Sequence, residues 1–333
     1  MYFSLIIPVY NRPDEIDELL SSLTRQDYRE KLEVVIIEDG STVPCRDVVL
    51  RYENLLYITY YNKPNSGPGS SRNFGMNKGR GDYFLIFDSD CILPQEYLTE
   101  VHKNLTLNYV DCFGGPDKAL DSFSDIQKAI NFAMTSFLTT GGIRGGSETI
   151  GKFQPRSFNM GISRTAFDAS KGFSHIHPGE DPDLSIRLWK LGFETKLYGS
   201  AYVYHKRRID WRKFYIQVTK FGKARPILNR WYPEYQKLTF FFPTIFIIGL
   251  AVAIIAALFS SLILLYLYVI YFMTVFVVAA AKSNLKVGLL AVAAVAIQFY
   301  GYGTGFLKSF VTIQVFDNDP EKVFPELFFK QHD

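Results

Sequence analysis

One stretch of the sequence limits what this chain can fold into. From Thr239 to Ala281 there are 43 residues without a single Asp, Glu, Lys or Arg. As a helix the stretch is about 65 Å long at ~1.5 Å per residue, whereas the hydrocarbon core of a bilayer is about 30 Å thick. This length predicts two membrane-spanning helices, with a turn near Ser260 and Ser261.

A third apolar run covers Val287 to Leu307 and contains the sequence "FYGYGTGF". Its small residues allow close helix packing but also break helices, so the run predicts either a third span or a re-entrant segment. Three spans are favoured over two. With three spans, the more acidic tail after Thr312 would lie on the far side of the membrane from the N-terminal region.

The orientation follows from the charges that flank the apolar runs. The N-terminal sequence "MYFSLIIPVYNRP" has no basic region and no cleavage site of a signal peptide. A basic block from His205 to Lys237 precedes the first span, with only Asp210 and Glu234 as acids. Such a block marks the cytoplasmic face and favours contact with lipid headgroups. The net charge of +3 is too small to indicate nucleic-acid binding.

The three cysteines agree with a cytosolic location. Cys45, Cys91 and Cys112 show neither paired nor metal-type spacing, as expected of reduced thiols.

The N-terminal part of the chain alternates apolar runs with loops and helix starts. The predicted strands are Phe3–Val9, Leu32–Ile37, Leu55–Tyr60 and Tyr83–Phe87. This alternation predicts an α/β fold with a mostly parallel sheet flanked by helices. Ligands of such sheets bind beyond the carboxyl ends of the strands, where this chain carries "YNR", "EDGS" and "DSD". The absence of GxGxxG and Walker motifs argues against a dinucleotide dehydrogenase and a P-loop phosphotransferase.

Two carboxylates follow the fourth predicted strand, in "LIFDSDC". On an extended strand Asp88 and Asp90 point the same way and Ser89 points away. Converging carboxylates repel each other unless a cation lies near them, and Mg²⁺ or Mn²⁺ bound to carboxylates and phosphates is the usual arrangement beside a nucleotide. A solvated turn is the alternative interpretation.

A second acidic group lies in "HPGEDPDLSIRLWKLGFE". Glu180, Asp181 and Asp183 stand at the start of a predicted amphipathic helix, whose apolar face consists of Leu184, Leu188 and Leu191. Helix capping explains one of these acids but does not require all three. The preceding loop "SFNMGISRTAF" adds a polar Asn159 between apolar neighbours.

His205, in "YVYHKRR", follows a strand-like stretch. A lone histidine is more often structural, but a neutral imidazole at a strand end is also a suitable Mn²⁺ ligand.

Seven segments of the first 225 residues form an ordered pattern. They are "SLIIPVYNR", "VVIIEDGS", "GPGSSRN", "DYFLIFDSDC", "SFNMGISRTAF", "GEDPDLSIRLWKLGF" and "AYVYHKRR". This pattern resembles the family 2 inverting glycosyltransferases, which have a nucleotide-sugar-binding fold of the GT-A type. The resemblance implies a metal-dependent glycosyltransferase with a divalent cofactor, Mn²⁺ or Mg²⁺, and a nucleotide-sugar donor such as a UDP-sugar.

The resemblance also implies how the donor is held. Arg72 would approach the donor and Asp88 would contact the nucleoside, with Asn159 as a further substrate contact. The nucleobase and ribose would lie against a larger set, which is Pro8, Val9, Tyr10, Glu38 and Asp39.

The remaining implied roles concern the chemistry. Asp90 and His205 would bind the metal on the diphosphate, Asp181 would be the catalytic base, and Glu180 would contact the acceptor or the donor sugar. An inverting transfer is a single in-line displacement, so it needs a base on the acceptor and a cation on the departing diphosphate. Arg207 or Arg208 could also neutralise the diphosphate, although contact with lipid is slightly favoured for both.

With the resemblance, the expected organisation has four parts. Residues 1–225 form a cytoplasmic GT-A domain, 226–238 a basic and aromatic interfacial linker, 239–311 a membrane domain with two or three helices, and 312–333 a polar tail. This predicts a multi-pass protein of the inner (cell) membrane.

One departure from the family pattern bears on the product. Processive polysaccharide synthases carry a Gln-x-x-Arg-Trp motif, and "QVTKF" from Gln217 does not match it. We therefore expect transfer of a single sugar to a membrane-associated acceptor, such as a lipid-linked saccharide or a glycolipid, in cell-envelope glycan assembly. The alternatives are transfer to polyprenyl phosphate and a non-catalytic nucleotide-binding scaffold.

Overall fold

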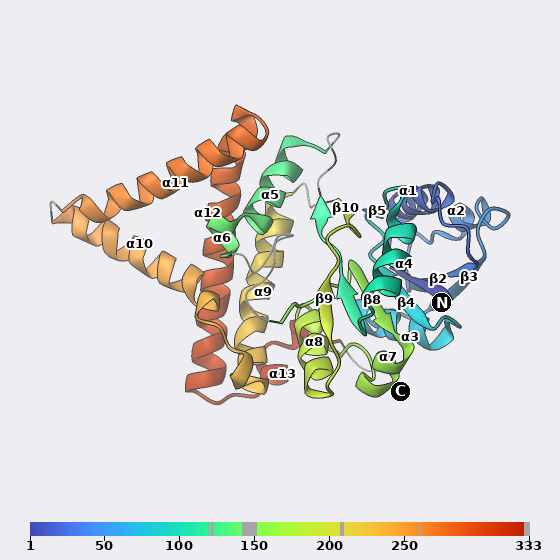
Figure 1. Ribbon diagram of the computed structural model, residues 1–333. Helices are drawn as coiled ribbons and strands as arrows, with labels where there is room; N and C mark the ends of the chain where they lie inside the picture. The colour runs from blue at the N-terminus through green and yellow to red at the C-terminus, as the bar shows by residue number, and fades with distance from the viewer. Residues whose placement is uncertain (119, 121–122, 142–151, 207–209, 260, 330–333) are drawn as a thin grey trace. The chain divides into compact units, whose positions relative to one another are not determined.

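The computed structural model describes residues 1–118, 120, 123–141, 152–206, 210–259 and 261–329 (Figure 1). The chain divides into two compact units. Unit 1 consists of Met1–Lys118, Gly146–Lys206 and Phe328–Asp333, and unit 2 of Ala119–Gly145 and Arg207–Leu327. The predicted domain boundary at residue 225 lies inside helix α9 (Trp211–Trp231), which belongs to unit 2.

Unit 1 is built on a seven-stranded sheet with the order β3-β2-β1-β4-β8-β6-β9. β8 runs antiparallel to its neighbours β4 and β6, and the other pairings are parallel. The strands are β1 (Phe3–Val9), β2 (Leu32–Asp39), β3 (Ile58–Lys63), β4 (Tyr83–Phe87), β6 (Cys112–Gly114), β8 (Asn159–Ser163) and β9 (Thr195–Leu197). The prediction of a mostly parallel α/β sheet is therefore confirmed.

Helices cover both faces of this sheet. The sheet separates two apolar clusters, one on each face. The first face carries α1 (Pro13–Thr24), α2 (Arg46–Leu50) and α4 (Tyr97–Leu107), and the second carries α3 (Pro68–Lys78), α7 (Arg164–Ser170) and α8 (Glu180–Lys190). On α8, Leu184 and Leu188 are fully buried as predicted. Leu191 is 51 % exposed because it lies just beyond the last residue of α8.

A small second sheet adjoins the end of β4. It has the order β5-β10-β7, formed by β5 (Cys91–Ile92), β10 (Val203–His205) and β7 (Asp117–Lys118). The antiparallel pairing aligns His205 with Cys91, directly after the "DSD" sequence. This sheet therefore brings His205 next to Asp90, which lies 115 positions earlier in the chain.

Unit 2 is helical. Its elements are α5 (Asp125–Thr135), α6 (Phe137–Thr140), α9, η1 (Pro233–Tyr235), η2 (Leu238–Phe240), α10 (Phe242–Leu258), α11 (Ile263–Lys282), α12 (Leu285–Phe310), η3 (Val311–Val315), α13 (Pro320–Val323) and η4 (Pro325–Leu327). α9 and α12 run in the same direction and meet at glycines. A Cβ on Gly222 would lie 2.2 Å from the Tyr302 carbonyl oxygen, and one on Gly305 would lie 2.5 Å from that of Thr219. The two backbones are therefore in direct contact.

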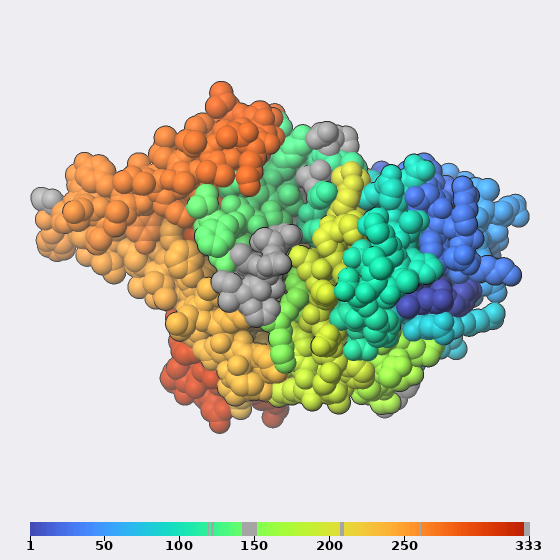
Figure 2. All heavy atoms as spheres, viewed as in Figure 1, coloured from blue at the N-terminus to red at the C-terminus, as the bar shows by residue number. Residues whose placement is uncertain are grey.

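Two helices are long and apolar enough to cross a membrane, Ile263–Lys282 and Leu285–Val315. A third apolar helix, Phe242–Leu258, is shorter, with 17 residues. Figure 2 shows α10 and α11 with their side chains on the outside of unit 2. Only 11 % of the apolar window in α11 is buried, against 39 % in α12, which packs on α9 and α5. Unit 2 thus exposes apolar surface mainly on α10 and α11.

Candidate active site

The site lies where β1, β2 and β4 end. These three strands are parallel neighbours, so the residues that follow them gather at one edge of the sheet. Asn11 joins two of the strand ends, because its side-chain carbonyl accepts hydrogen bonds from the amides of Thr42 (2.8 Å) and Val43 (2.9 Å). Asn11 has a left-handed backbone, with a φ of 53°.

The residues expected around the nucleobase differ in their solvent exposure. Tyr10 is 51 % exposed, Pro8 is partly buried and Val9 is buried. Glu38 is buried and accepts hydrogen bonds from the Cys45 amide (2.7 Å) and the Tyr60 hydroxyl (2.9 Å). Its oxygens are therefore already used within the chain, which makes Glu38 a support for the loop after β2.

Asp39 organises the loop that leads into α3. Its carboxylate pairs with Lys63 and accepts the backbone N–H groups of Ser66 and Gly67, each at 3.0 Å. Gly67 has a φ of 87°, a conformation that favours glycine. The "NSGPGSSRN" segment is thus fixed by Asp39, and it directs Arg72 of α3 toward the site.

Arg72 is buried between two carboxylates. Its Nη2 lies 2.7 Å from Asp88 Oδ1 and its Nη1 lies 3.3 Å from Glu180 Oε1. Burial opposes the guanidinium charge, but Asp88, Glu180 and Asp181 outweigh this effect and raise the pKa of Arg72. Through these two ion pairs, Arg72 links Asp88 of the "DSD" sequence to Glu180, which is far from it in the chain.

Asp90 has different partners from Asp88. Its carboxylate oxygens lie 3.1 Å from His205 Nε2 and 3.3 Å from Arg12 Nη1, while Ser89 between the two acids is buried. The side chains of Asp88 and Asp90 are thus neutralised by separate cations. The sequence motif "YNR" contained Arg12, but nothing in it indicated that Arg12 would pair with Asp90.

The ligand atoms of Asp90, Cys91 and His205 lie within 4.8 Å of one another. The Cys91 thiol is buried and donates to the Phe158 carbonyl at 3.3 Å, so it is already engaged within the chain. Asp90 and His205 remain as a carboxylate and an imidazole, a donor pair that suits Mn²⁺. His205 Nδ1 is buried without a hydrogen-bond partner, and the ring stacks on Phe158 at 4.7 Å. These residues therefore fit the divalent ion that the sequence predicted.

Glu180 and Asp181 are neighbours at the start of α8 but have contrasting surroundings. Glu180 contacts His177 Nδ1 at 2.8 Å, the Gly179 amide at 2.9 Å and Arg72. Burial favours its neutral form, but His177 and Arg72 outweigh burial and lower the pKa of Glu180. Both oxygens of Glu180 are occupied, and His177 was not identified from the sequence.

Asp181 retains an unused acceptor. Its Oδ1 is buried without a hydrogen-bond partner. Burial, together with the charge of Glu180, raises the pKa of Asp181 to about 6. A carboxylate with an open oxygen and a pKa near neutrality is well suited to accept a proton. Asp183, by contrast, pairs with Arg187 at 2.8 Å within α8.

Asn159 does not contact this group of residues. It is fully buried, its Nδ2 donates to the Ala201 carbonyl at 2.8 Å, and its Oδ1 accepts from the Tyr97 hydroxyl. Its carboxamide thus links core segments within the chain, and the expected substrate contact of Asn159 stays a prediction. Arg207 and Arg208 lie outside the described residues.

The family model "Glycosyl transferase family 2" matches residues 4–169. The chain carries a glycosyltransferase family 2 domain. This agrees with the family and the enzyme class that the sequence motifs indicate. The match spans β1 to α7 and includes the strand ends that carry Asp39, Asp88 and Asp90.

One curated relative is the poly(ribitol-phosphate) beta-N-acetylglucosaminyltransferase TarS of Staphylococcus aureus. It is 36 % identical over 103 residues, which cover 30 % of this chain and 18 % of that protein. The chain thus spans less than a fifth of the length of this relative.

Two solved structures share the fold over 95 % of this chain. The mannosyltransferase PcManGT of Pyrobaculum calidifontis, in complex with GDP-Man and Mn²⁺, aligns with a TM-score of 0.57, 15 % identity and 88 % of its own chain. TarS 1-349 of S. aureus, in complex with UDP-GlcNAc, aligns with a TM-score of 0.50, 18 % identity and 92 % of its chain. The GT-A-type fold that the sequence predicted is therefore confirmed.

Proposed function

We propose that this chain is an inverting, metal-dependent glycosyltransferase that moves a single sugar from a nucleotide-sugar donor to a membrane-associated acceptor. The observation that carries the proposal is the division of the acidic residues into two sets. Asp90 pairs with His205 and Arg12, whereas Asp181 keeps an open oxygen and a raised pKa. One set suits the departing diphosphate and the other suits the acceptor.

In this reaction the acceptor hydroxyl attacks the anomeric carbon while the bond from that carbon to the diphosphate oxygen breaks. Asp181 Oδ1 accepts the proton of the hydroxyl. Asp90 and His205 would hold a divalent ion, which neutralises charge on the diphosphate when bound. Arg72 adds a buried cation next to Asp88 and Glu180, and Glu180 holds Arg72 in place.

The donor class is supported by the related proteins. TarS has been crystallised with UDP-GlcNAc and PcManGT with GDP-Man. We favour a UDP-sugar, and cell-envelope glycan assembly as the setting, because the curated relative TarS acts on poly(ribitol-phosphate). The open oxygen of Asp181 favours a hydroxyl acceptor over a polyprenyl phosphate, which is already anionic and needs no strong base.

We further propose that the α10–α11 hairpin is inserted in the inner (cell) membrane and that unit 1 lies in the cytoplasm. Lysines flank the uncharged run on both sides, at Lys237 and Lys282, as expected if both ends face the cytoplasm. Phe328 and Phe329, which follow the apolar helices, contact residues of unit 1, and this supports an even number of crossings. The greater burial of α12 supports a position against α9 rather than a third crossing.

A transfer assay with the purified full chain tests the enzymatic proposal. UDP-GlcNAc, UDP-glucose and GDP-mannose would each be incubated with Mn²⁺ and membrane extract, and glycosylated products would be identified by mass spectrometry. We expect transfer from a UDP-sugar, and its loss in Asp181→Asn but not in Asp14→Asn, an exposed control. Near-normal transfer by Asp181→Asn would contradict the hydroxyl mechanism, and no transfer from any donor would contradict the enzyme assignment.

A further inference from the structure

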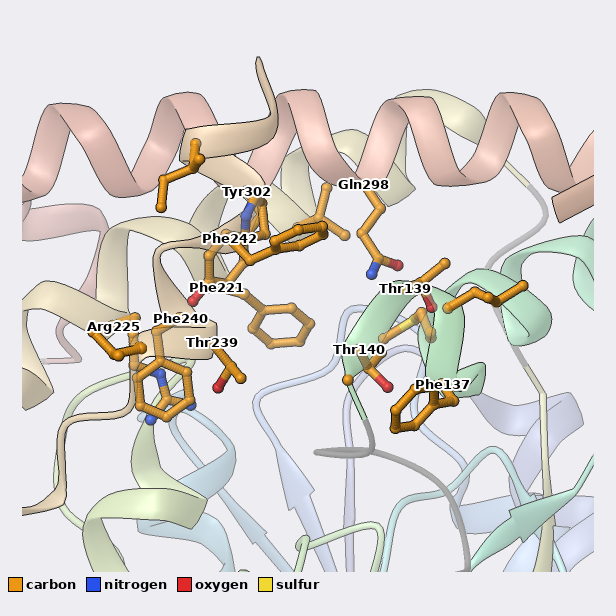
Figure 3. Close-up of a pocket in the computed structure, with 17 residues that line it drawn as sticks. Phe137, Thr139, Thr140, Phe221, Arg225, Thr239, Phe240, Phe242, Gln298 and Tyr302 are labelled. Atoms are coloured by element: carbon orange, nitrogen blue, oxygen red, sulfur yellow. The ribbon is translucent and has the colours of Figure 1, made fainter. Parts of the chain in front are cut away.

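Unit 2 contains a cavity of about 470 Å³, within the usual size range of ligand pockets (Figure 3). Its walls come from α6, α9, η2, α10 and α12 and are mainly apolar, with Phe137, Leu138, Phe221, Leu238, Phe242 and Ile245 among them. All the described lining residues belong to unit 2, and none of them is a residue of the candidate active site.

Two polar side chains interrupt these walls. Arg225 of α9 lies over the Phe240 ring at 4.0 Å and interacts with Tyr302, and no carboxylate in the described part of the chain pairs with it. Gln298 extends from α12 into the cavity (Figure 3), and its Oε1 is buried without a hydrogen-bond partner. The hydroxyl of Thr139 donates to carbonyls of its own segment. Among the residues that the structure describes, the cavity therefore offers one cation without a carboxylate partner inside an apolar enclosure.

We infer that this cavity binds a phospholipid of the surrounding bilayer, with its phosphate at Arg225 and hydrocarbon along the aromatic and aliphatic walls. A guanidinium is a preferred partner of phosphate, and an apolar enclosure excludes a purely hydrophilic anion. The walls from η2 and α10 lie at the start of the uncharged run, where the chain meets the bilayer in our proposed topology. The inference rests on the membrane part of the proposed function. We choose a bilayer lipid rather than the acceptor because every described residue that lines the cavity belongs to unit 2.

Lipid retention by the full chain tests this inference. The chain would be incorporated into vesicles of phosphatidylcholine and phosphatidylglycerol in equal parts, re-isolated in mild detergent and examined by native mass spectrometry. We expect the unmodified chain to retain phosphatidylglycerol and Arg225→Gln to retain roughly tenfold less. Arg225→Lys keeps the charge and should retain lipid within about threefold. Lys213→Gln, which removes an exposed cation from the same helix, should behave as the unmodified chain.

Equal retention by Arg225→Gln and the unmodified chain would overturn the inference, and so would an equal loss in Lys213→Gln. Sedimentation with vesicles separates this failure from that of the proposed function. If all variants associate with vesicles but retain lipid equally, only the lipid site fails. If none associates with vesicles, the membrane proposal fails and the lipid site fails with it.

A different observation concerns the segment Phe328–Phe329 of unit 1. Phe328 forms an antiparallel bridge with Ile176, and the Phe329 amide donates to the His175 carbonyl at 3.0 Å. The Phe329 ring lies 5.9 Å from the His177 ring, and a Cβ on Gly67 would lie 2.4 Å from Phe329 Cγ. The segment therefore contacts both the loop before Glu180 and the loop that Asp39 fixes.

We propose that Phe329 is a positioning residue for the proposed transfer reaction, acting through His177. Its ring restricts the imidazole that contacts Glu180 at 2.8 Å, and Glu180 in turn contacts Arg72. Without this ring the imidazole gains freedom and water, so the cluster around Asp181 loses its fixed charge arrangement. Such a change alters the rate and its pH dependence more than the binding of the donor.

Steady-state kinetics across pH test this role. We expect Phe329→Ala to lower kcat by roughly fivefold and to shift the acid limb of the kcat profile, with the donor KM within about twofold. Phe329→Trp should restore both values. Phe316→Ala, which removes an aromatic ring that is 69 % exposed, is the matched control. An unchanged pH profile in Phe329→Ala, or equal loss in Phe316→Ala, would overturn the proposal. If neither unmodified chain nor variants transfer sugar, the proposed function itself has failed.

Discussion

Apolar segments are buried in unit 1 but largely exposed on α11 of unit 2. The strand Phe3–Val9 of unit 1 is almost entirely buried in the sheet, whereas α11 of unit 2 leaves Ile263, Tyr266 and Ile270 at least 60 % exposed. Both segments are rich in aliphatic residues, so composition does not explain the difference. The strand is shielded by helices on both faces, whereas α11 packs mainly on α12 and α10. The exposed apolar surface of α11 supports the proposed insertion of this helix in a bilayer.

The two units also differ in what surrounds an arginine side chain. Arg72 in unit 1 is buried between Asp88 and Glu180, whereas Arg225 in unit 2 contacts an aromatic ring. The first arginine is held by the chain itself. The second has no carboxylate partner among the described residues, and our lipid proposal gives it a phosphate as partner.

The largest expected effect comes from replacing the two arginines, because only Arg72 is buried between carboxylates. Arg72→Gln leaves two carboxylates without their cation, so we expect it to lower the free energy of unfolding by about 3–5 kcal/mol. Arg225→Gln loses a cation–π contact with Phe240, worth about 0.5–1 kcal/mol, and the interaction with Tyr302, but leaves no described carboxylate without its cation. Thermal unfolding of both variants in detergent measures the difference. Equal shifts in Tm would contradict the distinction.

Replacing an exposed apolar residue by lysine should have different effects on α11 and on the surface of unit 1. Ile270→Lys places a charge near the middle of α11 and should cost about 2.5–3.5 kcal/mol for membrane insertion. Leu55→Lys changes an equally exposed leucine of unit 1, 67 % exposed, and should have no effect. Fractionation of cells into membrane and soluble protein measures the outcome. The bilayer interpretation fails if both variants remain equally in the membrane fraction.

The metal prediction tests the Asp90 side of the site. Asp90→Asn and His205→Ala should each weaken Mn²⁺-dependent UDP binding by roughly 10–100-fold, because each removes one of two proposed ligands. Chelation of the metal should weaken UDP binding of the unmodified chain to a similar extent. Cys91→Ser should leave it unchanged, since the Cys91 thiol donates to the Phe158 carbonyl within the chain. Isothermal titration calorimetry measures all four, and metal-independent UDP binding would refute the assignment.

The raised pKa of Asp181 gives a smaller effect on stability. Ionising a group whose pKa rises from 3.8 to about 6 on folding disfavours the folded state, so this penalty is absent below pH 3.8 and complete above about pH 6. Asp181→Asn should therefore be more stable than the unmodified chain at pH 8, on the order of 2 kcal/mol. The gap should disappear at low pH. Unfolding measured at several pH values tests this, and a pH-independent gap would show that the carboxyl does not titrate as proposed.

Much of the fold could be predicted from the sequence because its signals are local. The apolar runs located the central strands, and the acids after them located Asp88, Asp90 and Asp181. One strand was shifted: hydrogen bonds from the amides of Leu55 and Leu56 to the Tyr52 carbonyl continue a turn, so β3 begins at Ile58.

The pairings in the site could not be predicted in the same way, because they join distant segments. Arg12 meets Asp90 across 78 positions, and Asn159 is buried because Tyr97 and Ala201 take both ends of its carboxamide. Phe329 lies more than 150 positions from His177, and no local pattern links the two. The number of membrane spans stays a prediction, because apolar composition does not distinguish a helix that faces lipid from one that packs on α9.

The contact between α9 and α12 has a mechanical consequence. Backbone meets backbone at Gly222 and Gly305, and a Cβ at either position would collide with the other helix. Any larger residue at these positions would therefore force α9 and α12 apart. In the proposed topology, this close contact transmits a tilt of α12 in the bilayer to α9.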